Sequence, residues 1–122
     1  MKNLLSVTAI MEFGIGLAFL AYPSLPVNLL LGSSLNTPVE STLARVLGVA
    51  LIALGIACWL SRSYWKSHFT KGLVGGMLVY NIGVSVILVY TALGLTIFGI
   101  GLWPAVVLHL AMAVWCIIKL KN

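Results

Sequence analysis

The sequence predicts an all-α fold, an integral membrane four-helix bundle. Of the 122 residues, 61% are hydrophobic and only 7% are charged, whereas an ordinary globular domain is about half apolar and about a quarter charged. Four stretches approach the roughly 20 apolar residues that a membrane-spanning helix needs. Most of the basic residues fall at the ends of these stretches. We therefore expect a single transmembrane domain, residues 1–122, with no separate soluble domain.

The first predicted span covers about residues 4–22. Pro23 and Pro26 end it, because each proline removes a backbone donor and restricts the residue before it. Glu12 interrupts the apolar run and no A-x-A site precedes Pro23, so we expect a retained helix and no cleaved signal peptide. The following apolar piece, residues 27–32, is too short to span. It predicts a re-entrant or interfacial turn packed over the bundle, and a lid is the alternative.

The second predicted span, about residues 40–60, begins with a clear start signal. Thr37-Pro38-Val39-Glu40 places a cap residue, a proline at the first helical position and a glutamate three residues after the cap. This pattern is a capping box, so we assign Glu40 a structural role. The third and fourth spans cover about residues 72–92 and 103–118.

The basic residues predict the orientation of the bundle. Arg45 alone lies near one side of the bundle. The other six fall on the opposite side: Lys2, Arg62, Lys66, Lys71, Lys119 and Lys121. Cytoplasmic loops carry the excess of lysine and arginine. We therefore predict cytoplasmic N- and C-termini in a multi-pass protein of the inner membrane. The net charge of +5 does not indicate nucleic-acid binding, because the basic residues mark helix ends.

Small residues recur at the spacing that allows helix backbones to approach. The sequence offers four such pairs: Gly14 and Ala18, Ala44 and Gly48, Ala53 and Ala57, Gly72 and Gly76. These pairs are compatible with contacts inside one chain or with a homodimer.

One strongly polar residue falls inside each predicted span. These residues are Glu12, Arg45, Asn81 and His109, with Tyr80 and Ser85 as lesser members. Facing lipid, each would lack a partner, so we expect all of them to turn inward, in the middle and outer half of the bundle. The predicted inward face of the second span continues through Gly48, Ile52, Gly55 and Trp59.

A direct ion pair between Glu12 and Arg45 is not expected. Side chains lean toward the N-terminus of their own helix. Because the two spans run in opposite directions, these two side chains lean apart, and the alternative to an inward Arg45 is a side chain that reaches the outer interface. We expect Glu12 to meet Asn81, Tyr80 or a water, or to be protonated.

Three hypotheses follow for this polar cluster. In the first, it is a structural network that fixes helix register, in an assembly subunit without a ligand. In the second, Glu12, Arg45, Asn81, His109 and Tyr80 bind a small lipophilic or weakly anionic molecule, such as a quinone, in a pocket inside the bundle. In the third, Glu12 exchanges protons with a cationic substrate in a small transporter.

Nothing in the sequence indicates catalysis or a metal site. No nucleophile and base form a recognisable motif, one membrane histidine is too little for a metal, and Cys58 and Cys116 form no CxxC pair. We therefore expect a non-enzymatic protein without a cofactor. Its expected partners are the lipid bilayer, a quinone-like ligand, and a membrane protein or a second copy of the chain.

Several short motifs together resemble the DoxX-like group of small bacterial four-helix membrane proteins. They are Glu12, the run Ala44-Arg45-Val46-Leu47-Gly48, the pair Tyr80-Asn81, and Trp103-Pro104 followed by His109. The resemblance covers nearly the whole length. It implies a role as accessory subunit of a membrane redox system that uses quinone. The chain lacks the cysteine pair that some relatives carry, which argues against a redox role of its own.

The transporter hypothesis has a separate comparison. Small multidrug-resistance exporters are similar in having four helices, about this length and one glutamate in the first helix. The present chain lacks their aromatic motifs around the later spans and adds Arg45. The similarity is therefore an analogy in overall design.

Overall fold

The computed structural model describes all 122 residues and confirms the all-α prediction. It contains five α-helices and one short 3-10 helix: α1 (Lys2–Ala21), α2 (Ser24–Leu31), α3 (Pro38–Ser61), η1 (Arg62–Tyr64), α4 (His68–Leu93) and α5 (Leu102–Lys121). There are no strands. Four of the helices are long and apolar enough to cross a membrane: α1, α3, α4 and α5. In the second of these, η1 continues α3.

The start of α4 differs most from its prediction, at His68 in place of residue 72. Ser67 caps the helix, because its side chain accepts a hydrogen bond from the backbone N–H of Thr70 at 3.1 Å. The Thr70 hydroxyl in turn donates to the Tyr64 carbonyl at 2.8 Å. The first bond satisfies one of the N–H groups that a helix N-terminus otherwise leaves free, and the second joins the first turn of α4 to η1. The helix therefore begins within the basic connection.

The start of α3 is the predicted capping box. The Thr37 hydroxyl accepts from the backbone N–H of Glu40 at 3.2 Å. The Glu40 carboxylate accepts from the backbone N–H groups of Thr37 at 3.0 Å and of Asn36 at 2.7 Å. Glu40 thus holds the end of a helix, as its sequence position predicted.

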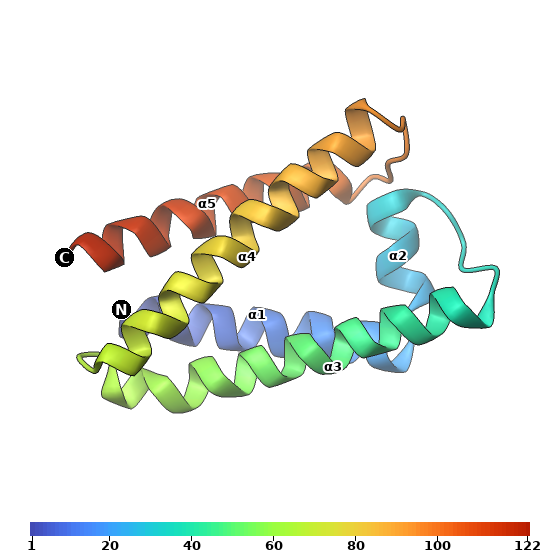
Figure 1. The fold of residues 1–122 in the computed structure, drawn as a ribbon. Helices are drawn as coiled ribbons and strands as arrows, with labels where there is room; N and C mark the ends of the chain where they lie inside the picture. The colour runs from blue at the N-terminus through green and yellow to red at the C-terminus, as the bar shows by residue number, and fades with distance from the viewer.

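The long helices form two pairs. In Figure 1, α1 lies along α3, and α4 crosses α5. Both termini and the connection through η1 lie at one end of the bundle, whereas α2 and the connection between α4 and α5 lie at the other. We refer to the first of these as the basic end, because six of the seven basic residues belong to it.

The closest contact between helices is the backbone contact of α1 with α3. A Cβ atom on Gly16 would lie 2.7 Å from the Gly48 carbonyl oxygen, and a Cβ on Gly48 would lie 2.7 Å from the Gly16 oxygen. A Cβ on Gly55 would lie 3.0 Å from the Ala9 oxygen. Only glycine permits such an approach, so these three positions set the distance between the two helices.

Of the four glycines in the predicted small-residue pairs, Gly48 makes a close contact inside the chain and the other three do not. A Cβ on Gly14, Gly72 or Gly76 would meet no atom within 4 Å. The spacing of small residues did not show which face of each helix meets a neighbour. Gly16, the main partner of Gly48, was not among the predicted pairs.

The two helix pairs meet through side chains near the basic end. The largest apolar core there is contributed by all four long helices: Leu4, Leu5, Ala9, Cys58, Val74, Met77, Met112 and Cys116. Within it the Cys58 thiol donates to the Met77 sulfur at 3.5 Å. This half of the bundle is closed and apolar.

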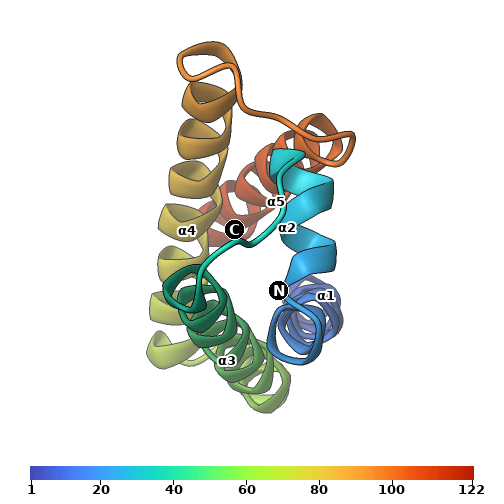
Figure 2. The same cartoon turned by 90° about the vertical axis from the view of Figure 1, so that its right-hand side faces the viewer.

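The other end is closed by α2, where the sequence predicted an interfacial turn. Figure 2 shows α2 between α1 and α5. Backbone hydrogen bonds from Gly99 to the Leu30 carbonyl (2.9 Å) and from Gly101 to the Leu29 carbonyl (2.7 Å) attach the α4–α5 connection to it. A Cβ on Gly99 would overlap the Leu29 oxygen. The short apolar segment is therefore a helix that two backbone hydrogen bonds attach to the α4–α5 connection.

The outer surface of the bundle is apolar. Only 24 of 122 residues are buried, so most of the hydrophobic residues face outward, including Ile10, Val46, Val79 and Val107. A monomeric soluble protein rarely exposes apolar patches of this extent. The surface and the four long helices together suggest a multi-pass membrane protein.

Gly16→Leu and Gly14→Leu form a matched pair that tests the α1–α3 contact. We expect Gly16→Leu to lower the free energy of unfolding by about 1–3 kcal/mol or more, because the side chain would overlap the α3 backbone. Gly14→Leu, two residues away on α1, should leave the stability within about 0.5 kcal/mol. Equilibrium denaturation in detergent micelles measures both. Equal effects of the two substitutions would contradict the contact.

Candidate functional site

An interior cavity of about 240 Å³ lies between the two helix pairs. All five α-helices contribute to its lining, which is mostly apolar. Its polar lining residues are Thr8, Glu12, Tyr80, Asn81 and His109. A largely apolar pocket with a few convergent polar groups is the usual form of a small-molecule site.

A hydrogen bond between Asn81 and His109 crosses from α4 to α5 at the cavity wall. His109 Nδ1 lies 2.8 Å from Asn81 Oδ1. The Asn81 amide nitrogen donates to the Met77 carbonyl at 2.7 Å, which fixes the orientation of the amide. Because Oδ1 can only accept, the proton must be on His109 Nδ1. A neutral His109 ring therefore has Nε2 as a free acceptor.

Two neighbouring side chains support this pair. The Tyr80 ring meets the His109 ring edge to face, with centroids 5.6 Å apart and planes at 79°. The Ser85 hydroxyl donates to the Asn81 backbone carbonyl at 2.8 Å, so it is occupied within α4. Of the two lesser members of the predicted cluster, Tyr80 lines the cavity and Ser85 does not.

Glu12 lies at the cavity wall on the α1 side. Its side chain is 7% exposed. The carboxyl group makes no hydrogen bond or ion pair within the chain, although Asn81 and Tyr80 line the same cavity. A buried carboxyl group without a partner is costly, whatever its protonation. Glu12 is therefore available to a molecule in the cavity.

Thr8 lines the cavity, although its position in the sequence placed it only on the face of Glu12 and not among the ligand-binding residues. It lies one turn before Glu12 on the same face of α1 and is 2% exposed. Its hydroxyl is buried and has no hydrogen-bond partner in the chain. Threonine in a helix usually bonds a carbonyl of the preceding turn and then needs nothing else, so sequence alone gave no reason to single it out.

Arg45 does not join the cluster, which corrects its predicted placement. It is exposed and does not line the cavity. The buried face of α3 runs through Ala44, Gly48, Leu51, Gly55 and Cys58. Successive residues of a helix are turned by about 100°, so a face centred on Ala44 turns Arg45 outward. The small side chain of Ala44 belongs on the crowded inner face, and a guanidinium does not.

The bundle thus brings together four of the five predicted site residues, Glu12, Tyr80, Asn81 and His109, and excludes Arg45. Chemically, the cavity offers two hydroxyl groups, one carboxyl group and one imidazole within an apolar wall. It contains no positively charged side chain. No group of three or more His, Cys, Asp or Glu residues could hold a metal ion. The arrangement can bind a polar group but offers no activated nucleophile.

Comparison with protein-family models, curated proteins and solved structures found no match to the chain.

A double-mutant cycle tests the bond between Asn81 and His109. We expect Asn81→Leu and His109→Leu each to destabilise the bundle, because each leaves the other polar group unpaired in an apolar wall. The double variant should lose less than the sum, with a coupling energy of about 0.6–1.7 kcal/mol. Denaturation in detergent gives the four stabilities. Thr91→Val, which removes an exposed hydroxyl bonded within α4, is the control. A coupling energy of zero would contradict the cross-helix bond.

Proposed function

We propose that this is a multi-pass protein of the bacterial inner membrane, with cytoplasmic termini, whose interior cavity binds a small lipophilic molecule. The observation that carries the proposal is the set of unpartnered polar groups in that cavity. Thr8, Glu12 and Tyr80 make no side-chain hydrogen bond within the chain, and His109 Nε2 is a free acceptor beside them, while the rest of the wall is apolar or already bonded. A ligand with one polar end would satisfy these groups and fill the apolar remainder.

The polar end of the ligand is neutral and carries both acceptor and donor capacity. The two hydroxyl groups can donate to a carbonyl, and Glu12 can accept from a hydroxyl or protonate an acceptor. An anionic end finds no cation in the cavity, because Arg45 is outside it. The hypothesis of a weakly anionic ligand thus loses Arg45, the residue on which it was based.

The size of the cavity restricts the ligand further. At about 240 Å³ it lies below the roughly 300–1,000 Å³ of pockets for drug-sized ligands. A quinone-like head group fits this description, with any long tail outside. The resemblance to the DoxX-like group motivates a role as accessory subunit of a membrane redox system, in contact with a partner protein or a second copy of the chain.

Proton-coupled transport is the second candidate function. It is favoured by the placement of Glu12, the only acidic residue inside the bundle, since the other, Glu40, is bonded at the exposed start of α3. With no cation beside it, Glu12 would release its proton to water, and the resulting carboxylate would bind a cationic substrate in the place of the proton. The purely structural hypothesis requires instead that the cavity have no ligand and no flux.

Ligand retention in the purified protein tests the binding proposal. We expect a small lipophilic molecule to remain bound in mild detergent and to be found by native mass spectrometry. Glu12→Gln should weaken its binding about tenfold to hundredfold, the effect of losing a hydrogen bond to a charged group. Glu40→Gln is the matched control, because a capping box accepts glutamine. Retention that Glu12→Gln leaves unchanged would contradict the proposal.

Proton flux in liposomes separates the transporter from the binding protein. Substrate-driven flux that Glu12→Gln abolishes would establish transport and overturn the binding role. Unfolding of Glu12→Gln, without ligand or flux in the wild type, would identify the structural role.

Single added cysteines test the orientation. Native Cys58 and Cys116 are fully buried, so their background reaction with a maleimide should be low. We expect Ser63→Cys and Asn122→Cys to react with a membrane-impermeant maleimide in inside-out vesicles only, and Ser33→Cys in intact spheroplasts only. The reverse pattern would overturn the predicted topology.

A further inference from the structure

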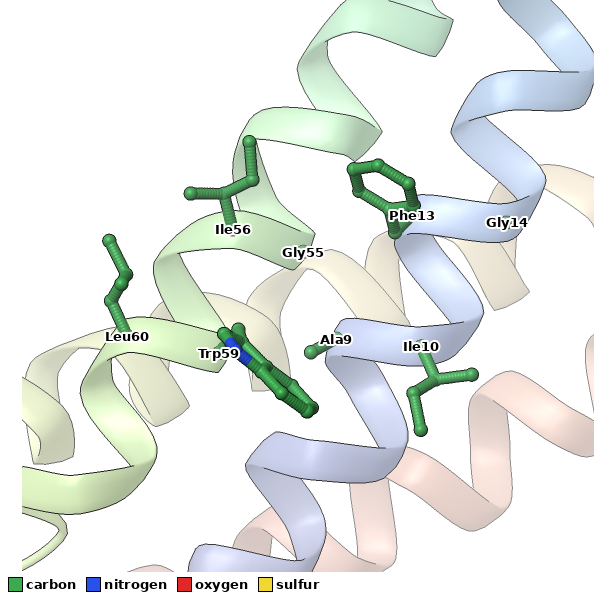
Figure 3. Close-up of a pocket in the computed structure, with 8 residues that line it drawn as sticks. All are labelled: Ala9, Ile10, Phe13, Gly14, Gly55, Ile56, Trp59 and Leu60. Carbon is green, nitrogen blue, oxygen red and sulfur yellow. The ribbon is translucent and has the colours of Figure 1, made fainter.

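A second hollow lies on the outside of the bundle, between α1 and α3. It is a groove of about 410 Å³ with an almost wholly apolar lining. Figure 3 shows Trp59 at one end and Phe13 and Gly14 toward the other, with Gly55 between the two helices. The glycines leave this space open, because even a Cβ atom on Gly14 would meet no other atom within 4 Å. The groove thus runs from near the basic end toward the middle of the bundle.

An arginine side chain stacks on Trp59, one of the residues that line this groove. The Arg62 guanidinium lies over the Trp59 ring, 3.2 Å from its centre. Stacking on a ring face positions the planar guanidinium and leaves its in-plane N–H groups free. Arg62 makes no hydrogen bond or ion pair with the chain, so these donors are available to a phosphate, which they suit by geometry.

The charges around this end are all positive. Lys66 lies 5.0 Å from the Trp65 ring centre, and the other basic residues of this end are Lys2, Lys71, Lys119 and Lys121. The only acidic residues of the chain are elsewhere, Glu12 inside the bundle and Glu40 at the start of α3. No acidic side chain therefore neutralises this end.

We propose that the α1–α3 groove is a binding site for an anionic phospholipid, with one acyl chain in the groove and the phosphate on Arg62. This inference rests on the membrane placement proposed above but not on any ligand in the interior cavity. An acyl chain matches the apolar lining of the groove. The anionic head group supplies the negative charge that the basic end lacks.

A second copy of the chain fits the groove less well. Copies inserted with the same orientation would bring two basic ends together, with no acidic residue on either to offset them. The charge of the end therefore favours a phospholipid over a homodimer at this surface.

Lipid retention by the full chain in mild detergent is the test, with phosphatidylglycerol and phosphatidylcholine as probes. Native mass spectrometry should show that the wild type retains phosphatidylglycerol about fivefold better, the preference expected from one basic residue at an anionic surface. Arg62→Gln should abolish that preference. Gly14→Leu should remove both lipids, because the new side chain would fill the groove without disturbing the α1–α3 contact.

Two control variants accompany these. Arg45→Gln removes one charge at the opposite end, and Gly76→Leu adds the same side chain at an open glycine of α4. Neither should change lipid retention. Equal retention of the two lipids by the wild type, or an unchanged preference in Arg62→Gln, would overturn the proposal. A dimer that Gly14→Leu converts to monomer would show that a second copy occupies the groove. A chain that stays dispersed without detergent would instead overturn the membrane placement itself.

Discussion

The backbone contact between α1 and α3 at Gly16 and Gly48 is the constraint on which the rest of the structure depends. Two glycines allow the helix backbones to touch, which fixes the rotation of both helices about their own axes. That rotation turns Thr8 and Glu12 toward the interior cavity and Arg45 away from it. It also leaves a groove on the outer side of the same helix pair. One close contact therefore decides where the polar groups of two helices face.

The second helix pair supplies the polar half of the cavity. Asn81 and His109 satisfy each other across α4 and α5, so this wall is fixed before any ligand arrives. The α1 wall is different, because Thr8 and Glu12 have no partners there. The Asn81–His109 bond fixes the geometry of one wall, while the unpartnered groups on α1, together with Tyr80, make an empty cavity costly.

The two hollows differ in chemistry because they differ in their surroundings. The interior cavity lies between the apolar core near the basic end and α2, and no positively charged side chain lines it. The groove opens outward and ends at Arg62 on Trp59. The interior cavity suits a small neutral ligand, and the groove suits an acyl chain of a phospholipid with an anionic head group.

The sequence by itself determined the all-α class, the four long apolar helices, the capping box at Thr37 and Glu40, and the inward position of Glu12, Asn81 and His109. Composition, local hydrogen bonding and the cost of unpaired polar groups act within one helix or on each residue singly, so they are readable without a fold. The tertiary structure alone decided that Gly16 meets Gly48, that Arg45 faces outward, and that Asn81 pairs with His109 while Glu12 stays unpaired. Those outcomes depend on the rotation of each helix against its neighbours. A shift of one residue turns a side chain by about 100°, and small residues on several faces left that rotation open.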